Sequence, residues 1–148
     1  MYRNILVAVD GSHTSDIALQ EAIKLAGEAQ AQLRIVHAVD TVNLGPDVEF
    51  PNPVEMVELM VNSGWDVLHK AEAVAREAGV KAEAKLIKID VLAHRVPEVI
   101  AQDAEAWPAD LIVIGTHGRR GISRLFLGSV AEGVARVATK PVLLVRGD

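Results

Sequence analysis

Short apolar runs, separated by longer segments with helical spacing, set the pattern of the chain. The runs cover residues 5–9, 33–39, 111–114 and 142–145. A short apolar run is typical of a strand, and one without polar alternation is typical of a strand buried on both faces. The pattern therefore predicts strands at these four places, with 5–9 and 111–114 fully buried.

The first segment with helical spacing follows the first run. Its apolar residues recur from Ile17 up to Gly27, where we expect the helix to end. Ser12, Thr14 and Ser15 precede or open this segment, and each is a candidate cap.

A second helix is expected from Pro53 to about Gly79, because Asn52-Pro53 has the residue types of a cap and a first helical residue. Gly64 should weaken its middle. Residues 40–53 before it are rich in Pro, Gly and Asn and predict a loop. Its predicted inner face consists of Met56, Leu59, Met60, Val67, Leu68, Ala71 and Ala75. Two shorter helices are expected at 97–106 and 128–139.

Residues 81–89 alternate charged and apolar side chains, which predicts a half-exposed strand at or near a sheet edge. Strands and helices then alternate along the whole chain. This alternation indicates an α/β fold, a parallel sheet with helices on both faces in three layers. With no composition shift or linker, we expect residues 1–148 to form one domain.

The composition argues against several classes of function. The 148 residues carry 15 basic and 20 acidic side chains, a net charge of 15 − 20 = −5, with no Cys. The acidity argues against a nucleic-acid-binding face and a polybasic membrane anchor, and the missing Cys excludes disulfides and cysteine-ligated metals. No apolar stretch approaches the roughly 18 residues of a membrane span, and the start does not have the pattern of a signal peptide. We expect a cytoplasmic protein without membrane insertion.

The least ordinary residues follow two of the buried strands. Asp10-Gly11-Ser12 follows the run 5–9, and a Gly-rich segment, 115–121, follows the run 111–114. In an open five-stranded sheet of order 3-2-1-4-5, these two strands are neighbours where the strand order reverses. Ligands of such sheets bind beyond the carboxyl ends of the strands at this place.

The Gly-rich segment is suited to an anion. Four of the 11 glycines lie between 115 and 128, and Ser129 opens the next helix, whose N-terminus attracts negative charge. Arg119, Arg120 and Arg124 add positive charge, although they can also be solvated surface residues. These features together predict a phosphate site. The spacing is neither that of a P-loop nor Gly-x-Gly-x-x-Gly.

Asp10 has two readings of equal weight. Its carboxylate can accept ribose hydroxyls or help to hold a divalent cation, or it can end the strand and help to cap the helix. His117 can reach a phosphate or orient its loop, whereas His37 is interpreted as a hydrogen-bonded structural residue. A triad of Ser12, His117 and Asp10 is disfavoured because Ser12 is not on a Gly-x-Ser-x-Gly elbow. The histidines show no zinc spacing, so the metal site is unknown.

The segment Gly115-Thr-His-Gly118, nine residues and then Gly128-Ser129 resembles the Gly-x2-Gly-x9-Gly-(Ser/Thr) signature of the universal stress protein family, in its ATP-binding branch. The resemblance extends over nearly the whole chain, through Ile5-Leu-Val-Ala-Val-Asp-Gly-Ser, Val36-His-Ala-Val-Asp40 and Lys140-Pro-Val-Leu-Leu-Val145. It implies the Rossmann-like sheet order 3-2-1-4-5 and an ATP site at the crevice. The glycines that non-binding members lose are all present, while Ala8 stands where some ATP binders have Pro.

The resemblance also implies roles for particular positions. Asp10 would contact ribose, Ala38 would contact adenine through its main chain, and the residues of the Gly motif would line the ribose and phosphates. The complete set of candidate binding residues is Ala8, Val9, Asp10, Ala38, Ile114, Gly115, His117, Gly118, Arg119, Gly128, Ser129 and Val130.

The sequence thus favours an ATP-binding stress sensor or regulator, with or without Mg²⁺, that hydrolyses ATP slowly at most. Three alternatives stay open: a nucleotidyl-transfer or phosphohydrolase enzyme on the same scaffold, an interaction module without a ligand, and a site that binds AMP or a cyclic nucleotide instead of ATP. Residues 142–145 would form an apolar edge strand, through which we expect a homodimer, as the resemblance also implies.

Overall fold

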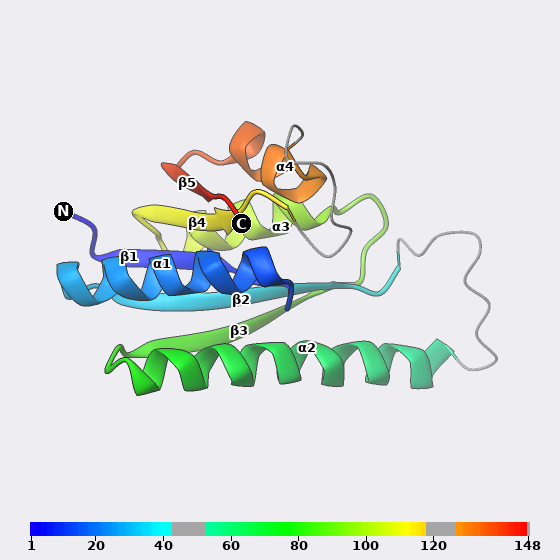
Figure 1. The fold of residues 1–148 in the computed structure, drawn as a ribbon. Helices are drawn as coiled ribbons and strands as arrows, with labels where there is room; N and C mark the ends of the chain where they lie inside the picture. The colour runs from blue at the N-terminus through cyan, green and yellow to red at the C-terminus, as the bar shows by residue number, and fades with distance from the viewer. Residues whose placement is uncertain (43–52, 118–126, 148) are drawn as a thin grey trace.

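Five parallel strands form one sheet of order β3-β2-β1-β4-β5 in the computed structural model (Figure 1), which describes residues 1–42, 53–117 and 127–147. This is the predicted order. The strands are β1 (Asn4–Ala8), β2 (Gln32–Asp40), β3 (Ala82–Ile89), β4 (Leu111–Gly115) and β5 (Val142–Val145). The helices are α1 (His13–Ala29), α2 (Pro53–Glu77), α3 (Val96–Ala106) and α4 (Ser129–Val137).

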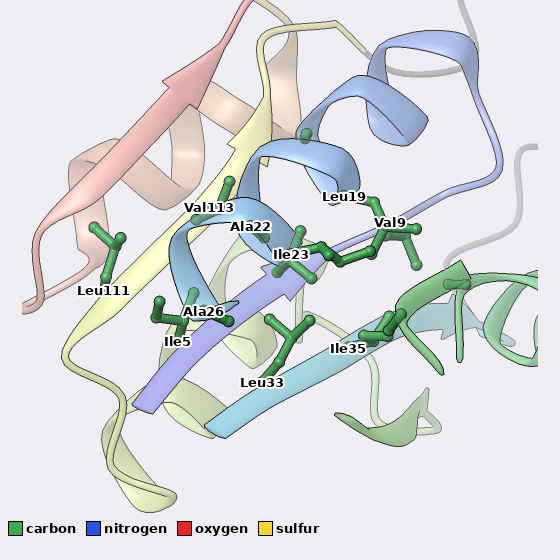
Figure 2. Close-up of a cluster of buried hydrophobic side chains, with 14 of the residues drawn as sticks. Ile5, Val9, Leu19, Ala22, Ile23, Ala26, Leu33, Ile35, Leu111 and Val113 are labelled. Atoms are coloured by element: carbon green, nitrogen blue, oxygen red, sulfur yellow. The ribbon is translucent and has the colours of Figure 1, made fainter. Parts of the chain in front are cut away.

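Helices cover both faces of the sheet, as the alternation predicts. Helices α1 and α2 pack on one face, over a cluster that contains Ile5, Leu33 and Leu111 (Figure 2), while α3 and α4 pack on the other face over Leu6 and Ile112. Neighbouring residues of β1 and β4 thus face opposite layers, which is why these strands carry no polar alternation. Strand β3 lies at one edge, and its alternating charges reach solvent there.

Helix α1 is longer than its sequence predicts. Ser12 is its N-cap, one of the three candidates, and its hydroxyl accepts the N–H of Ser15. The helix does not end at Gly27 but continues to Ala29, and Gln30 takes the left-handed conformation at φ 53°. Gly27 is instead an internal position, where an added Cβ would lie 3.7 Å from Val80. At the other end of the chain, α4 is shorter than the predicted 128–139, because Ala138 is already extended.

The inner face of α2 differs from the predicted one at Leu59, which is 67% exposed. The buried positions follow from a close approach at Gly64, where an added Cβ would lie 2.8 Å from Leu86 and 3.0 Å from His37. Gly64 therefore lets the middle of α2 approach the sheet, and this contact sets the rotation of the helix. The buried positions of α2 are Met56, Gly64, Leu68, Ala71 and Ala75.

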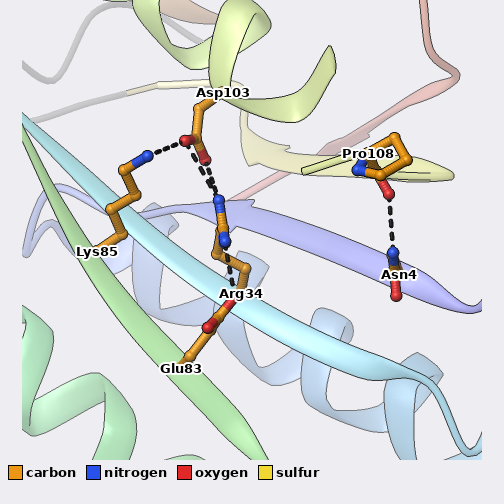
Figure 3. A network of polar contacts seen from close by, with 6 residues as sticks. All are labelled: Asn4, Arg34, Glu83, Lys85, Asp103 and Pro108. Atoms are coloured by element: carbon orange, nitrogen blue, oxygen red, sulfur yellow. Dashed lines mark hydrogen bonds and ion pairs between the residues drawn. The ribbon is translucent and has the colours of Figure 1, made fainter. Parts of the chain in front are cut away.

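An ion cluster ties α3 to β2 and β3 (Figure 3). The carboxylate of Asp103, whose side chain is 6% exposed, accepts from Arg34 Nη1 at 3.1 and 3.2 Å and from Lys85 Nζ. Arg34 Nε donates to Glu83 at 2.8 Å, and the guanidinium lies 4.8 Å from the ring centre of Trp107. Burial lowers the pKa of Arg34, but hydrogen bonds to Glu83 and Asp103 outweigh it, so the pKa lies above its ordinary value.

A second polar contact fixes the start of β1. The carboxylate of Asp110 accepts the backbone N–H groups of Arg3 at 2.8 Å and Asn4 at 2.9 Å. The side chain of Asn4 donates to Pro108 O at 2.8 Å (Figure 3). The hydrogen bonds from Arg3 and Asn4 hold the pKa of Asp110 below its ordinary value, because they favour the ionised carboxylate.

Asp110→Asn should lower the melting temperature at neutral pH, with a deficit that disappears in acid. The folded-state pKa of Asp110 is depressed below 3.8. Its contribution is therefore present above that pH and lost as the pH falls through the folded value. Because water screens this exposed carboxylate, we expect the melting temperatures of parent and variant to differ by only about 1–3 °C at neutral pH. Melting curves of parent and variant at descending pH test this, and a gap that stays constant down to about pH 2 would contradict it.

Candidate functional site

A cavity of about 270 Å³ opens at the carboxyl ends of β1, β2 and β4, on the face that α3 and α4 cover. It lies where the strand order reverses between β1 and β4, the place where open parallel sheets bind ligands. Its volume approaches the roughly 300 Å³ at which small-molecule sites begin.

The structure brings most of the predicted binding residues to this cavity. Gly118 and Arg119 lie outside the described residues, as do Arg120 and Arg124. The ten predicted residues that line the cavity are Ala8, Val9, Asp10, Ala38, Ile114, Gly115, His117, Gly128, Ser129 and Val130.

Asp10 forms a tight turn between β1 and α1. Its Oδ1 accepts the N–H of Ser12 at 2.9 Å, and its own N–H donates to the hydroxyl of Ser15 at 3.0 Å. Asp10 thus shapes the start of α1, as the structural reading expects. Its half-buried side chain also lines the cavity, and Oδ2 has no hydrogen-bond partner in the described part of the chain. The two readings of Asp10 are therefore compatible.

His37 ties β2 to the end of β1. Its Nδ1 lies 2.7 Å from the carbonyl oxygen of Val9, which can only accept, so Nδ1 carries the proton. The hydrogen bond agrees with the structural role expected for His37. The residue also lines the cavity, a placement the sequence did not indicate.

The end of β4 is held from three sides. At Gly115, an added Cβ would lie 2.9 Å from Thr14 Cγ2 and 3.1 Å from Thr14 O, so this glycine lets the first turn of α1 approach. Thr116, which is buried, donates its N–H to Val145 O at 2.9 Å and accepts from Gly128 N at 2.7 Å. The first glycine of the motif thus has a packing role in addition to its place on the cavity wall.

Helix α4 presents its N-terminus to the cavity. Gly128 is the N-cap and Ser129 the first helical residue, and both line the cavity. No side chain caps this end of the helix within the described part of the chain. Its first N–H groups have no acceptor inside the helix and carry the positive end of the helix dipole. This end of the cavity is therefore suited to an anion.

An apolar wall comes from α3, which the sequence did not connect with the site. Val96 and Ile100 extend from its first turns, and Val36 and Ala131 continue the apolar surface. Ordinary aliphatic residues carry no local signal of ligand contact, since only packing of α3 on the sheet brings them there. The lining residues that sequence reasoning missed are Ser15, Val36, His37, Val96, Ile100, Thr116 and Ala131.

The geometry assigns no catalytic residue and no metal site among the described residues. The hydroxyl of Ser12 accepts from Ser15 at the α1 cap, and Nδ1 of His117 pairs with the hydroxyl of Thr116 at 3.0 Å. These bonds give Ser12 a capping role and do not join it to His117. Across 1–42, 53–117 and 127–147, no three His, Asp or Glu side chains gather in a way that could hold a metal ion. No helix among the same residues is long and apolar enough to span a membrane.

Two solved structures with a bound nucleotide share this fold. A universal stress protein from Archaeoglobus fulgidus in complex with dAMP matches with a TM-score of 0.71 and 26% identity, over 97% of this chain and 98% of that one. A universal stress protein in complex with cAMP matches with a TM-score of 0.71 and 26% identity, over 97% of each chain.

Proteins of related sequence match this chain over almost its whole length. The universal stress protein MJ0531 of Methanocaldococcus jannaschii is 38% identical, over 99% of this chain and 83% of its own. The pattern of the universal stress protein family matches residues 1–146. With the predicted sheet order and motif in place, the chain belongs to the universal stress protein family.

Proposed function

We propose that the cavity binds an adenine nucleotide, ATP in the first place, and that its occupancy is the signal of a stress-response regulator. One observation carries the proposal: the same cavity has an apolar wall on α3 and the N-terminus of α4, which no described side chain caps. A base needs the first and phosphate groups need the second. In this proposal residues 1–148 act as one nucleotide-binding unit in the cytoplasm.

Each part of the nucleotide has a partner of suitable chemistry. Val96, Ile100 and Ala38 offer an aliphatic surface for the base. Asp10, whose Oδ2 has no partner among the described residues, would accept ribose hydroxyls or share a Mg²⁺ ion with the phosphates. The N–H groups at the start of α4 and the hydroxyl of Ser129 would donate to phosphate oxygens. Gly118 and Arg119 of the motif would complete the phosphate site.

The nucleotide complexes of two relatives support adenine recognition in this fold, since cAMP and dAMP share the base. Both of these ligands carry a single phosphate, so the choice of ATP among the adenine nucleotides is part of the proposal. Hydrolysis should be slow, because the proposal uses the carboxylate of Asp10 to bind ribose or Mg²⁺ and because Nδ1 of His117 pairs with the hydroxyl of Thr116. Neither group is then positioned as a dedicated general base for an attacking water.

The test is to denature the purified protein, chromatograph the released small molecules, and titrate the nucleotide-free protein by calorimetry. We expect co-purified adenine nucleotide, and tighter binding of ATP than of AMP or cAMP. GTP serves as the control for the base. Absence of both a co-purified nucleotide and measurable ATP binding would refute the proposal, and tighter binding of AMP or cAMP would correct its choice of ligand.

We further propose that the protein is a homodimer joined through β5, which lies at the edge of the sheet and exposes part of Leu144. Leu144→Asp should then convert the dimer to a monomer, because each dimer would bring together two carboxylates at an apolar contact. Light scattering coupled to size exclusion measures the mass. Leu59→Asp changes an exposed leucine of α2 in the same way and should leave the dimer intact. A dimer mass unchanged by Leu144→Asp would contradict this interface.

A further inference from the structure

Gly133 of α4 lies against Pro97 of α3 with no room for a side chain. A Cβ added at Gly133 would lie 2.5 Å from Cγ and 2.6 Å from Cβ of Pro97. Real Cβ atoms essentially never approach other atoms so closely, so one of the two helices would have to move. The proline ring cannot rotate away as a flexible side chain does.

Both helices carry cavity walls next to this contact. Val96 precedes Pro97 and Ile100 follows it by one turn, and both line the cavity. On α4, Val130 and Ala131 line the cavity two to three residues before Gly133. Because packed interiors transmit strain, a displacement at the contact would move these walls.

The far end of α3 cannot follow such a displacement freely. Asp103 holds it to β2 and β3 through Arg34 and Lys85. A helix held at Asp103 and pushed at Pro97 would tilt, and the tilt would be largest at its first turn, where Val96 lies.

We propose that the contact between Gly133 and Pro97 is a positioning contact for the nucleotide site, because it sets the distance between α3 and α4 and so the width of the part of the cavity that holds the base. Gly133 acts through the walls and does not itself line the cavity. The inference rests on the proposed function. It assigns a role to a glycine outside the Gly motif, which ends at Gly128-Ser129.

Gly133→Ala should weaken binding of ATP and of AMP by the same factor, about tenfold or about 1.4 kcal/mol. The factor is the same because the tilt moves Val96 most, and Val96 lies on the wall proposed for the base, which the two ligands share. Pro97→Gly removes both ring atoms that the new Cβ would meet. In the Pro97→Gly background, Gly133→Ala should therefore change affinity by less than about threefold.

Gly27→Ala is the matched control, since its Cβ would make an ordinary 3.7 Å contact on the other face of the sheet. It should leave both affinities unchanged, and thermal melting of every variant verifies folding. Equal ATP affinity of the parent and Gly133→Ala would overturn this inference alone, as would a loss that Pro97→Gly does not rescue. A parent that binds no adenine nucleotide would overturn the proposed function and the inference together.

Discussion

Ser129→Asp should reduce ATP affinity about 100-fold while leaving the fold intact. Ser129 is the first residue of α4 and lines the cavity at the end suited to phosphate. Like charges about 4 Å apart repel by about 4 kcal/mol in partly solvated surroundings. Salt screens part of this repulsion. The remaining repulsion of about 2.7 kcal/mol corresponds to an ATP affinity about 100-fold lower.

The same substitution should not destabilise the protein, because a carboxylate at the first turn of a helix interacts favourably with the helix dipole. Adenosine, which has no phosphate, should bind the variant and the parent alike. Calorimetry with ATP and adenosine, together with melting curves, separates the two effects. A loss that is equal for ATP and adenosine would place the phosphates elsewhere.

Two further variants serve as controls for charge and for the hydroxyl. Ser63→Asp adds the same charge at an exposed position of α2, on the other face of the sheet, and should leave ATP affinity unchanged. Ser129→Ala removes only one hydroxyl donor and should cost far less affinity than Ser129→Asp. A similar loss from Ser63→Asp would show that net charge, and not the position at α4, repels ATP.

Asp103→Ala should lower the free energy of unfolding by about 3 kcal/mol. The substitution removes the carboxylate that pairs with Arg34 and Lys85 and leaves the guanidinium of Arg34, whose side chain is only 16% exposed, with Glu83 and the Trp107 ring. Breaking a buried pair from one side costs about 3–5 kcal/mol. We expect a loss at the lower end of this range because Glu83 still pairs with Arg34 and because the Lys85 side chain is 50% exposed. Thermal melting should show a decrease of about 6–12 °C.

The exposed pair of Glu132 and Arg136 on α4 provides the comparison. Their side chains are 55% and 74% exposed, so water and salt already screen the contact. Arg136→Ala should therefore cost less than about 1 kcal/mol. Similar losses for Asp103→Ala and Arg136→Ala would mean that burial of the Asp103 cluster contributes little to stability.

The order of strands and helices, and the end of the sheet at which the cavity lies, were predictable from local pattern. Runs such as 5–9 and 111–114 are long enough to specify buried strands, and alternation with helices leaves few topologies for a parallel sheet. The Gly motif marks the end of β4 and the start of α4, and the other predicted residues lie at the ends of β1 and β2, so ten of them line one cavity. Helix ends were less predictable, since α1 passes through Gly27 to Ala29.

Contacts between distant segments could not be predicted from local pattern. Leu59 fits the period of an inner face, yet the close approach of Gly64 to Leu86 turns it outward. Val96 and Ile100 have the same chemistry as any core residue, and they face the cavity because α3 packs there.

The glycines show most clearly what the sequence predicts and what only the packed fold determines. As a residue type, Gly115 indicates only that some neighbour comes close, and Gly133 is an ordinary weak position in a helix. The fold identifies the neighbours as Thr14 and Pro97. Periodicity and motif spacing are properties of residues close together in the sequence, so the sequence by itself specifies the helices, the strands and the position of the Gly motif at the start of α4. The width of the cavity and the apolar wall depend on which helices meet, and that is a property of the packed molecule.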